Sequence, residues 1–137
     1  MSPKTTNTPS ELELLILKVL WQATDEGIAP IPVREVRNRL EGLGRKLAHT
    51  SVITTLNIMV EKNSVTRSRL KNAFLFAPKL QLETVQKKEV SNLLDRVFDG
   101  SPEDLMVALL GSKKVDKESV EKIKKLIAKK SKELRDK

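Results

Sequence analysis

The chain has 137 residues and contains no cysteine. This absence excludes a disulfide framework, a thiolate metal site and any cysteine chemistry. Histidine is almost as rare, because His49 is the single one in the sequence, and a metal site is therefore not expected. Aromatic residues are limited to one Trp and three Phe, while 32% of the residues are charged. This composition favours a helical chain.

Long apolar runs are missing as well. No stretch approaches the roughly 20 residues that span a bilayer, and the polar start Met1–Thr6 lacks the apolar core of a signal peptide. We therefore expect a cytoplasmic protein without membrane insertion. The sequence also offers no glycine-rich phosphate loop and no nucleophile–base pair, so we expect neither an enzyme nor a cofactor.

The positive charge of the chain, a net +8, is unevenly distributed. Residues 45–79 carry seven basic side chains and one acidic side chain, which is a local footprint for a polyanionic partner. Residues 112–137 carry eleven basic and five acidic side chains. The interspersed acidic residues favour a solvated helix in this second block, and a second nucleic-acid surface is the alternative.

Capping residues and apolar spacing predict the first helices. Residues 1–7 are expected to be disordered, and Thr8-Pro9-Ser10-Glu11 has the form of a capping box with Thr8 as the N-cap and Pro9 at the first helical position. The helix should run to about Gln22, with Trp21 in the core. Pro30–Pro32 predicts a short edge strand, and a second helix should begin near Val33 and end at Gly42.

A third helix is predicted from about His49 to Lys62, with Val52, Leu56, Met59 and Val60 turned inward. Two strands should follow, at Val65–Arg69 and Ala73–Ala77, joined by a turn around Lys71. Three helices followed by a hairpin is the order of a winged helix-turn-helix. We therefore predict a mainly α fold, with a winged helix-turn-helix domain in residues 8–78.

Residues 79–137 are predicted to form a helical dimerisation domain. Three amphipathic helices are expected there, at about Glu83–Phe98, after an N-cap at Ser101, and after an N-cap at Asp116. They have too little partner surface within one chain, so we expect their apolar stripes to pack against a second copy in a homodimer. The residues expected at this interface are Val90, Leu93, Leu94, Val97, Phe98, Leu105, Leu109, Val120, Ile123 and Ile127.

The predicted third helix indicates DNA recognition. Residues 49–60 contain no Asp, Glu, Lys or Arg, are rich in hydroxyls, and are framed by cations on both sides. Thr, Ser and Asn can reach base edges while the framing cations meet phosphates, and Ile53 can meet a thymine methyl. The expected DNA contacts are His49, Thr50, Ser51, Ile53, Thr54, Asn57, Arg45, Lys46, Lys62, Arg67, Arg69 and Lys71.

Several segments resemble the penicillinase repressor (BlaI/MecI) family in a single register over residues 10–127. Glu11–Trp21 resembles the first helix of that family, Leu47–Leu56 its recognition helix, and Leu93–Ser101 its dimerisation region. The resemblance implies a homodimeric, winged-helix transcriptional repressor that binds a palindromic operator. It also implies release by an upstream signal or by proteolysis, with a membrane-bound sensor or sensor protease as a further partner.

The sequence departs from the pattern of that family at particular positions. His49 stands where an aromatic residue is usual, Ile58 where a basic residue is usual, and Asn63 where Gly is usual. Pro32 stands where a Thr often caps the second helix. The bond that corresponds to the cleavage site of cleaved members is Ala108-Leu109 rather than Asn-Phe. A winged-helix adaptor that binds proteins without specific DNA binding is the alternative function.

Overall fold

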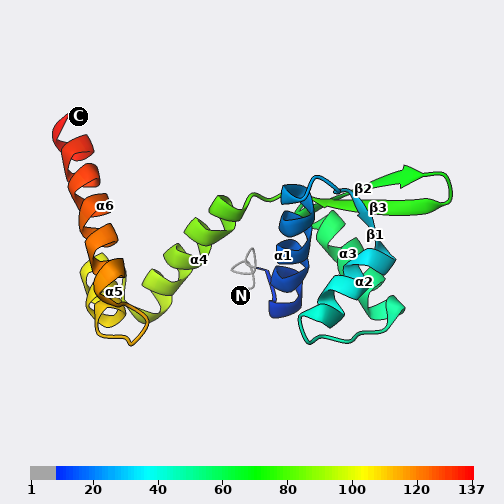
Figure 1. Ribbon diagram of the computed structural model, residues 1–137, viewed down its shortest axis with the longest axis horizontal. Coiled ribbons are helices and arrows are strands. Elements are labelled where there is room, and N and C mark those ends of the chain that lie inside the picture. Colours follow the sequence, from blue (N-terminus) through cyan, green and yellow to red (C-terminus); the bar gives the residue numbers. More distant parts are fainter. Residues whose placement is uncertain (1–8) are drawn as a thin grey trace. The chain divides into compact units, whose positions relative to one another are not determined.

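The computed structural model of the protein describes residues 9–137, and the elements of this part of the chain are shown in Figure 1. The expected disorder of residues 1–7 and the expected N-cap at Thr8 lie outside the described residues. The order of elements is that predicted from the sequence. The elements are α1 (Glu11–Asp25), β1 (Ile31–Pro32), α2 (Val33–Gly42), α3 (His49–Glu61), β2 (Val65–Leu70), β3 (Ala73–Pro78), α4 (Leu82–Val97), α5 (Pro102–Leu110) and α6 (Lys117–Arg135).

The start of α1 differs from the prediction. Ser10 is the N-cap, its hydroxyl accepts from the Glu13 backbone N–H at 3.1 Å, and the Glu13 carboxylate accepts from the Ser10 N–H at 3.2 Å. The capping box is therefore Ser10–Glu13, and Pro9 precedes the helix. The sequence contains two overlapping capping-box patterns, Thr8–Glu11 and Ser10–Glu13. The second one, whose Glu13 carboxylate is buried, is the one that forms. The helix also extends beyond the predicted end, to Asp25.

The sheet is antiparallel, with the strand order β1-β3-β2. Ile31 pairs with Phe76, which confirms the predicted edge strand, and Arg67 pairs with Phe76 from the other side. Each long strand extends one residue beyond its predicted end. The turn at Lys71 has a φ of 56°, so the hairpin reverses in two residues. The hairpin projects beside the helices as the wing (Figure 1).

The hydrophobic core of the N-terminal unit joins α1, α2, α3 and the sheet. Ile16, Leu20, Leu40 and Phe76 are fully buried there. On α3, Val52, Leu56 and Met59 are fully buried as predicted, whereas Val60 is half-buried against the core. Trp21, predicted to lie in the core, is only partly buried at its edge. Its indole N–H donates to the carbonyl of Leu80 at 2.9 Å, which ties α1 to the segment after β3.

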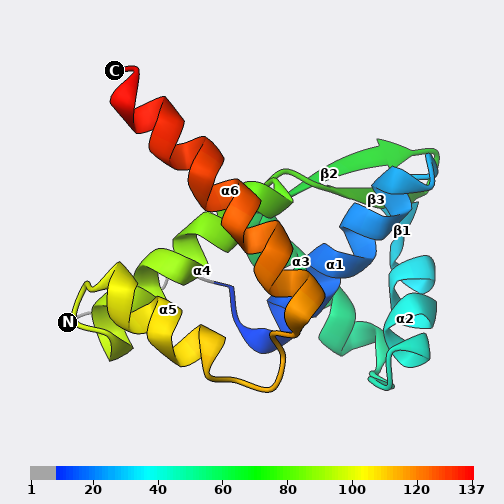
Figure 2. The ribbon, with the colours of Figure 1, turned by 60° about the vertical axis from the view of Figure 1, so that its left-hand side comes forward.

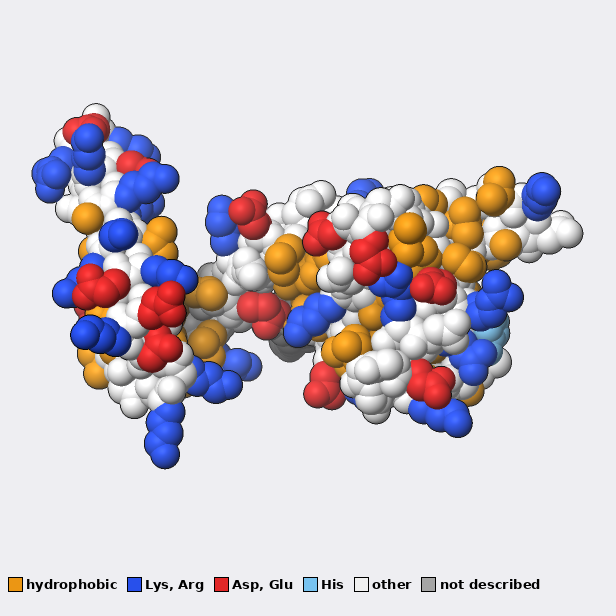
Figure 3. All heavy atoms as spheres, in the orientation of Figure 1, with side chains coloured by type: hydrophobic (Ala, Val, Ile, Leu, Met, Phe, Trp, Pro, Cys, Tyr) orange, Lys and Arg blue, Asp and Glu red, His pale blue; other side chains and the backbone are white. Residues whose placement is uncertain are grey.

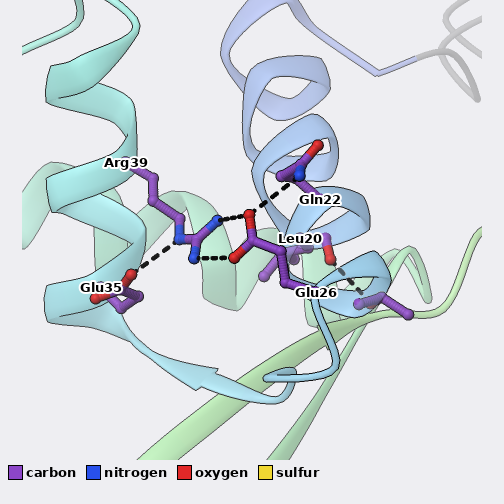
Figure 4. A network of polar contacts seen from close by, with 6 residues as sticks. Leu20, Gln22, Glu26, Glu35 and Arg39 are labelled. Atoms are coloured by element: carbon purple, nitrogen blue, oxygen red, sulfur yellow. Dashed lines mark hydrogen bonds and ion pairs between the residues drawn. The ribbon is translucent and has the colours of Figure 1, made fainter.

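Arg39 on α2 connects the end of α1 to its own helix. Its guanidinium donates to Glu26 at 2.7 Å and to Glu35 at 2.9 Å, as shown in Figure 4. The hydrogen bond from Arg39 lowers the pKa of the Glu26 carboxyl, and the same bond raises the pKa of Arg39. Both charges therefore persist over the whole ordinary pH range. The contact ties α2 to the C-terminal end of α1.

The chain divides into two compact units, with the boundary between Glu89 and Val90. The boundary falls inside α4, whose first half carries the buried side chain Val85. In the C-terminal unit, Ser101 and Asp116 cap α5 and α6 through hydrogen bonds to backbone N–H groups, as predicted. No residue of α5 or α6 is buried. Figure 2 shows these helices from a second direction.

Candidate nucleic-acid interface

The exposed face of α3 is formed by a row of uncharged polar side chains. Val52, Leu56 and Met59 are fully buried on one side of the helix. Thr50, Thr54 and Asn57 follow each other at i, i+4 and i+7 on the other side. Thr50 and Thr54 are exposed, and Asn57 is half-buried. Thr50 and Thr54 are therefore accessible to a ligand, and Asn57 is accessible in part.

The hydroxyl groups of α3 are not all equally available. Thr55 donates its hydroxyl to the carbonyl of Ser51 at 2.9 Å within the helix, so this group is already bonded. Thr50, Ser51 and Thr54 are exposed, and within residues 9–137 their side chains make no such bond. His49 is exposed at the first helical position. The predicted contacts at these four positions are thus accessible at the surface.

The apolar residues of this face differ from the prediction. Ile53, expected to be exposed, is half-buried and packs against the core, which leaves only part of its side chain accessible. Ile58, in contrast, is 42% exposed on the outer side of α3. Sequence reasoning noted Ile58 as a departure from the family pattern but did not include it among the contacts. Its exposure makes it the better-placed apolar group on the helix.

The cations that frame α3 differ in whether an acidic side chain already pairs with them. Lys46 is exposed, and the guanidinium of Arg45 lies 3.9 Å from the Glu11 carboxylate. Lys62 is paired with the carboxylate of Glu13 at 3.0 Å, and Glu13 is 7% exposed. The charge of Lys62 is therefore compensated within the domain. Among the three, Lys46 is the most available to a phosphate.

The wing presents two arginines on one face. Arg67 and Arg69 lie on alternate positions of β2, opposite Phe76 and Phe74. Their guanidinium carbons lie 4.9 Å and 5.4 Å from the centroid of the Phe74 ring, within the range of cation–π attraction. Phe74 is 43% exposed, since it lies beyond the edge of the core. Lys71 is exposed at the turn.

One hydrogen bond connects the wing to α3. The Nη1 atom of Arg67 donates to the Oδ1 atom of Asn57 at 2.8 Å. Arg69 instead donates to the carbonyl of Lys71 at 3.2 Å, within the wing. The sequence placed Asn57 and Arg67 on the same surface, but nothing in their spacing indicated a direct contact. The structure brings together Asn57, predicted to contact a base or phosphate, and Arg67, predicted to contact a phosphate.

The structure shows the backbone setting of two departures from the family pattern, Asn63 and Pro32. Asn63 has a φ of 65° at the end of α3, and its N–H donates to the carbonyl of Val60. This left-handed conformation favours Gly, and Asn tolerates it better than most residues. Pro32 is the N-cap of α2 and makes no side-chain cap hydrogen bond. The polar contact expected from a Thr at that position is therefore absent.

Within residues 9–137 there is no group of three or more His, Cys, Asp or Glu side chains that could hold a metal ion. No helix of the described residues is long and apolar enough to cross a membrane.

A family model for the penicillinase repressor matches residues 9–129. The chain belongs to the penicillinase repressor family. The match covers both the winged-helix elements and the C-terminal helices through most of α6. Membership indicates a DNA-binding transcriptional repressor. No individual curated protein matches the chain.

The apolar side chains expected at a dimer interface lie on the surface of the single chain. Val90, Val97, Leu109 and Ile127 are 41–58% exposed. Leu93, Leu94, Phe98, Leu105, Val120 and Ile123 are half-buried. Acidic and basic groups are intermixed around them in the C-terminal unit (Figure 3). The unit thus leaves its apolar stripes without a closed core.

Ala108 and Leu109, the predicted cleavage bond, lie in the last turn of α5. Both residues are exposed, and residues 111–116 connect α5 to α6 without regular helix.

Proposed function

We propose that this protein is a sequence-specific repressor that acts as a homodimer on a palindromic operator. The observation that supports it is the exposed row Thr50–Thr54–Asn57, which has no charged side chain and stands beside the wing arginines. Uncharged polar groups on a helix suit base edges in a major groove, whereas cations suit phosphates. An electrophoretic shift with the DNA upstream of the protein's own gene tests the function, and the absence of any shift with that DNA would favour the adaptor function.

The recognition helix and the wing have different roles in this proposal. Thr50, Ser51 and Thr54 read bases, and Lys46, Arg69 and Lys71 bind phosphates, with Arg45 and His49 at the start of the helix. Ile53 and Ile58 offer apolar surface to thymine methyl groups. Lys62 adds little, because Glu13 holds its ammonium group.

We expect Thr54→Ala and Arg69→Ala to weaken operator binding in different ways. Loss of a base contact costs about 1–3 kcal/mol of binding free energy and relaxes specificity at one base pair. Loss of a phosphate contact weakens binding to all sequences and lowers by roughly one the slope of the logarithm of the binding constant against the logarithm of the salt concentration. Thr54→Ala should therefore reduce the ratio of operator to random-DNA affinity, and Arg69→Ala should preserve it. Fluorescence anisotropy titrations at several salt concentrations measure both quantities.

Thr55→Ala is the matched control for this experiment. It removes the same hydroxyl from the next residue of α3, but this hydroxyl is already bonded to Ser51. The operator-to-random ratio should be that of the unmodified protein. Equal loss of specificity in the Thr54 and Arg69 variants would mean that the wing also reads sequence at Arg69.

The proposed dimer reads an inverted repeat. A two-fold axis between the chains requires two similar half-sites about 10 bp apart, or a multiple of that distance. The C-terminal helices supply the contacts between copies, because their apolar side chains are exposed and the basic groups around them remain in solvent. The N-terminal unit, with its closed core, supplies the DNA contacts.

Release from the operator acts through the dimer in this proposal. A cut within residues 99–116 would separate α6 from α4 and weaken pairing without altering the DNA-reading surface. Because Ala108-Leu109 lies in a helical turn, cleavage there by a sensor protease requires local unfolding, while the connection at residues 111–116 is more accessible.

Mass spectrometry of the protein from cells under induction distinguishes the two modes of release. Proteolysis predicts a fragment that ends within residues 99–116 and a matching loss of the full-length chain. A full-length chain that persists while the target gene is derepressed would contradict proteolysis and indicate release by a ligand or partner.

A further inference from the structure

The hydrogen bond between Arg67 and Asn57 determines which atoms of the Asn57 amide remain available. An asparagine side chain has one acceptor, Oδ1, and two donor hydrogens on Nδ2. The Arg67 guanidinium occupies Oδ1 at 2.8 Å, and its positive charge strengthens the bond. Oδ1 has a second lone pair, but the bound guanidinium makes it a poor site for a further donor, so the free edge of Asn57 is its donor edge.

This state of the amide matters for base recognition. A free asparagine recognises adenine with two bonds, because Nδ2 donates to N7 and Oδ1 accepts from the N6 amino group. The second bond would have to use the remaining lone pair of Oδ1, beside a guanidinium whose positive charge repels the hydrogens of the N6 amino group. Bases that present acceptors alone at that edge, such as guanine through N7 and O6 or thymine through O4, have no such conflict.

Arg67 is held in place before DNA arrives. Its guanidinium also lies 4.9 Å from the centroid of the Phe74 ring, and its strand is paired with β3 at the buried Phe76. Two contacts from different elements fix the side chain, so the free protein already has the geometry. Such preorganisation reduces the ordering cost of binding.

We propose that Arg67 is a positioning residue that makes Asn57 a donor-only reader, so that the repressor selects an acceptor-bearing base and discriminates against adenine at one operator position. This inference rests on the proposed function, in which the exposed face of α3 lies in the major groove. It assigns to the wing an effect on sequence preference, exerted through α3, in addition to phosphate binding.

Arg69 provides a matched control on the same strand. It lies on the same face of β2 and packs against the same Phe74 ring, at 5.4 Å, but its hydrogen bond goes to Lys71 rather than to α3. A substitution of either arginine removes one positive charge from the wing. Only the substitution of Arg67 frees the Oδ1 atom of Asn57.

The experiment is selection of bound duplexes from a randomised library by the full-length protein and its variants, followed by titration of the four base pairs at each selected position. Arg67→Ala should raise the relative affinity for adenine at one position by about five-fold or more, the effect of one gained base bond. Arg69→Ala should lower the affinity for all duplexes and leave every base preference unchanged. Arg67→Lys retains a cationic donor and should keep the original preference.

Asn57→Asp is a second test of the same assignment. The carboxylate still accepts from Arg67 but has no hydrogen to donate. The preference for an acceptor-bearing base at the affected position should be lost, because a carboxylate accepts only, as from the N4 amino group of cytosine. The melting temperature should stay within a few degrees of that of the unmodified protein. Retained preference in this variant would show that Asn57 does not read a base through Nδ2 and would overturn the inference.

The outcomes separate this inference from the function on which it rests. Equal losses of affinity for Arg67→Ala and Arg69→Ala, with unchanged preferences, would make Arg67 a phosphate contact only, and the repressor function would stand. A full-length protein that selects no common sequence from the library would contradict sequence-specific repression itself.

Discussion

A chain that ends at Glu89 should remain folded, sediment as a monomer and bind the operator about 10²- to 10⁴-fold more weakly than the full-length protein. The truncation removes α5, α6 and the second half of α4, and with them the apolar side chains assigned to the dimer. Each winged helix alone makes few contacts, and tight binding depends on two linked half-sites. Analytical ultracentrifugation and a shift assay measure the two effects.

The position of the truncation follows from the contacts of the N-terminal unit. The sequence predicts a winged-helix domain that ends near Pro78, but Leu80 accepts a hydrogen bond from Trp21 and Val85 is buried in the core. A chain cut at Pro78 would lose these contacts. Weaker DNA binding by that chain could then come from an unstable domain as well as from loss of the dimer. A chain cut after Glu89 keeps them, and a dimer found for that chain would place the pairing surface in the N-terminal unit.

Point variants of the full chain provide a control for the truncation. Ile127 lies on the apolar stripe of α6 with Val120 and Ile123, and it is 58% exposed. Ile127→Gln should weaken the dimer, because it places an amide among these side chains. Lys125→Gln, two residues away on a different side of the helix, should leave the dimer unchanged. The pair separates the loss of an apolar contact from a general effect on α6.

Local patterns in the sequence were sufficient for most elements of the fold. Val52, Leu56 and Met59 are buried on α3 as predicted, and Ser101 and Asp116 cap their helices as predicted. These features depend on residues close to each other in the chain. The N-cap of α1 was predicted wrongly because two overlapping boxes satisfy the same pattern, and burial of the Glu13 carboxylate distinguishes them.

The contacts between distant segments could not be predicted in this way. Glu13 and Lys62 are 49 residues apart, and Trp21 and Leu80 are 59 residues apart. Charge alone placed Lys62 among the phosphate contacts, whereas the folded chain provides it with an internal carboxylate. The link between Asn57 and Arg67 likewise depends on how closely the wing approaches α3. Sequence patterns predict a DNA-binding surface, and the tertiary contacts determine which of its side chains are free of internal partners.

Phe76→Ala should destabilise the N-terminal unit by about 3–5 kcal/mol, the range measured when a buried aromatic side chain is removed. Phe76 is fully buried on β3, the central strand, where it pairs with Ile31 on one side and Arg67 on the other. Its loss leaves a cavity between the sheet and the helices that the neighbouring strands cannot close. Urea unfolding followed by circular dichroism measures the change in the free energy of unfolding.

Phe74→Ala is the matched control, since it removes the same ring two residues earlier on the same face of β3. Phe74 is 43% exposed and packs against the arginines of the wing rather than the core. Its loss should lower the free energy of unfolding by about 1 kcal/mol or less, because a cation–π contact at an exposed site contributes about 0.5–1 kcal/mol. Similar destabilisation by both variants would contradict the assignment of the core to Phe76, and would mean that the wing is as much a part of the folded core as the central strand.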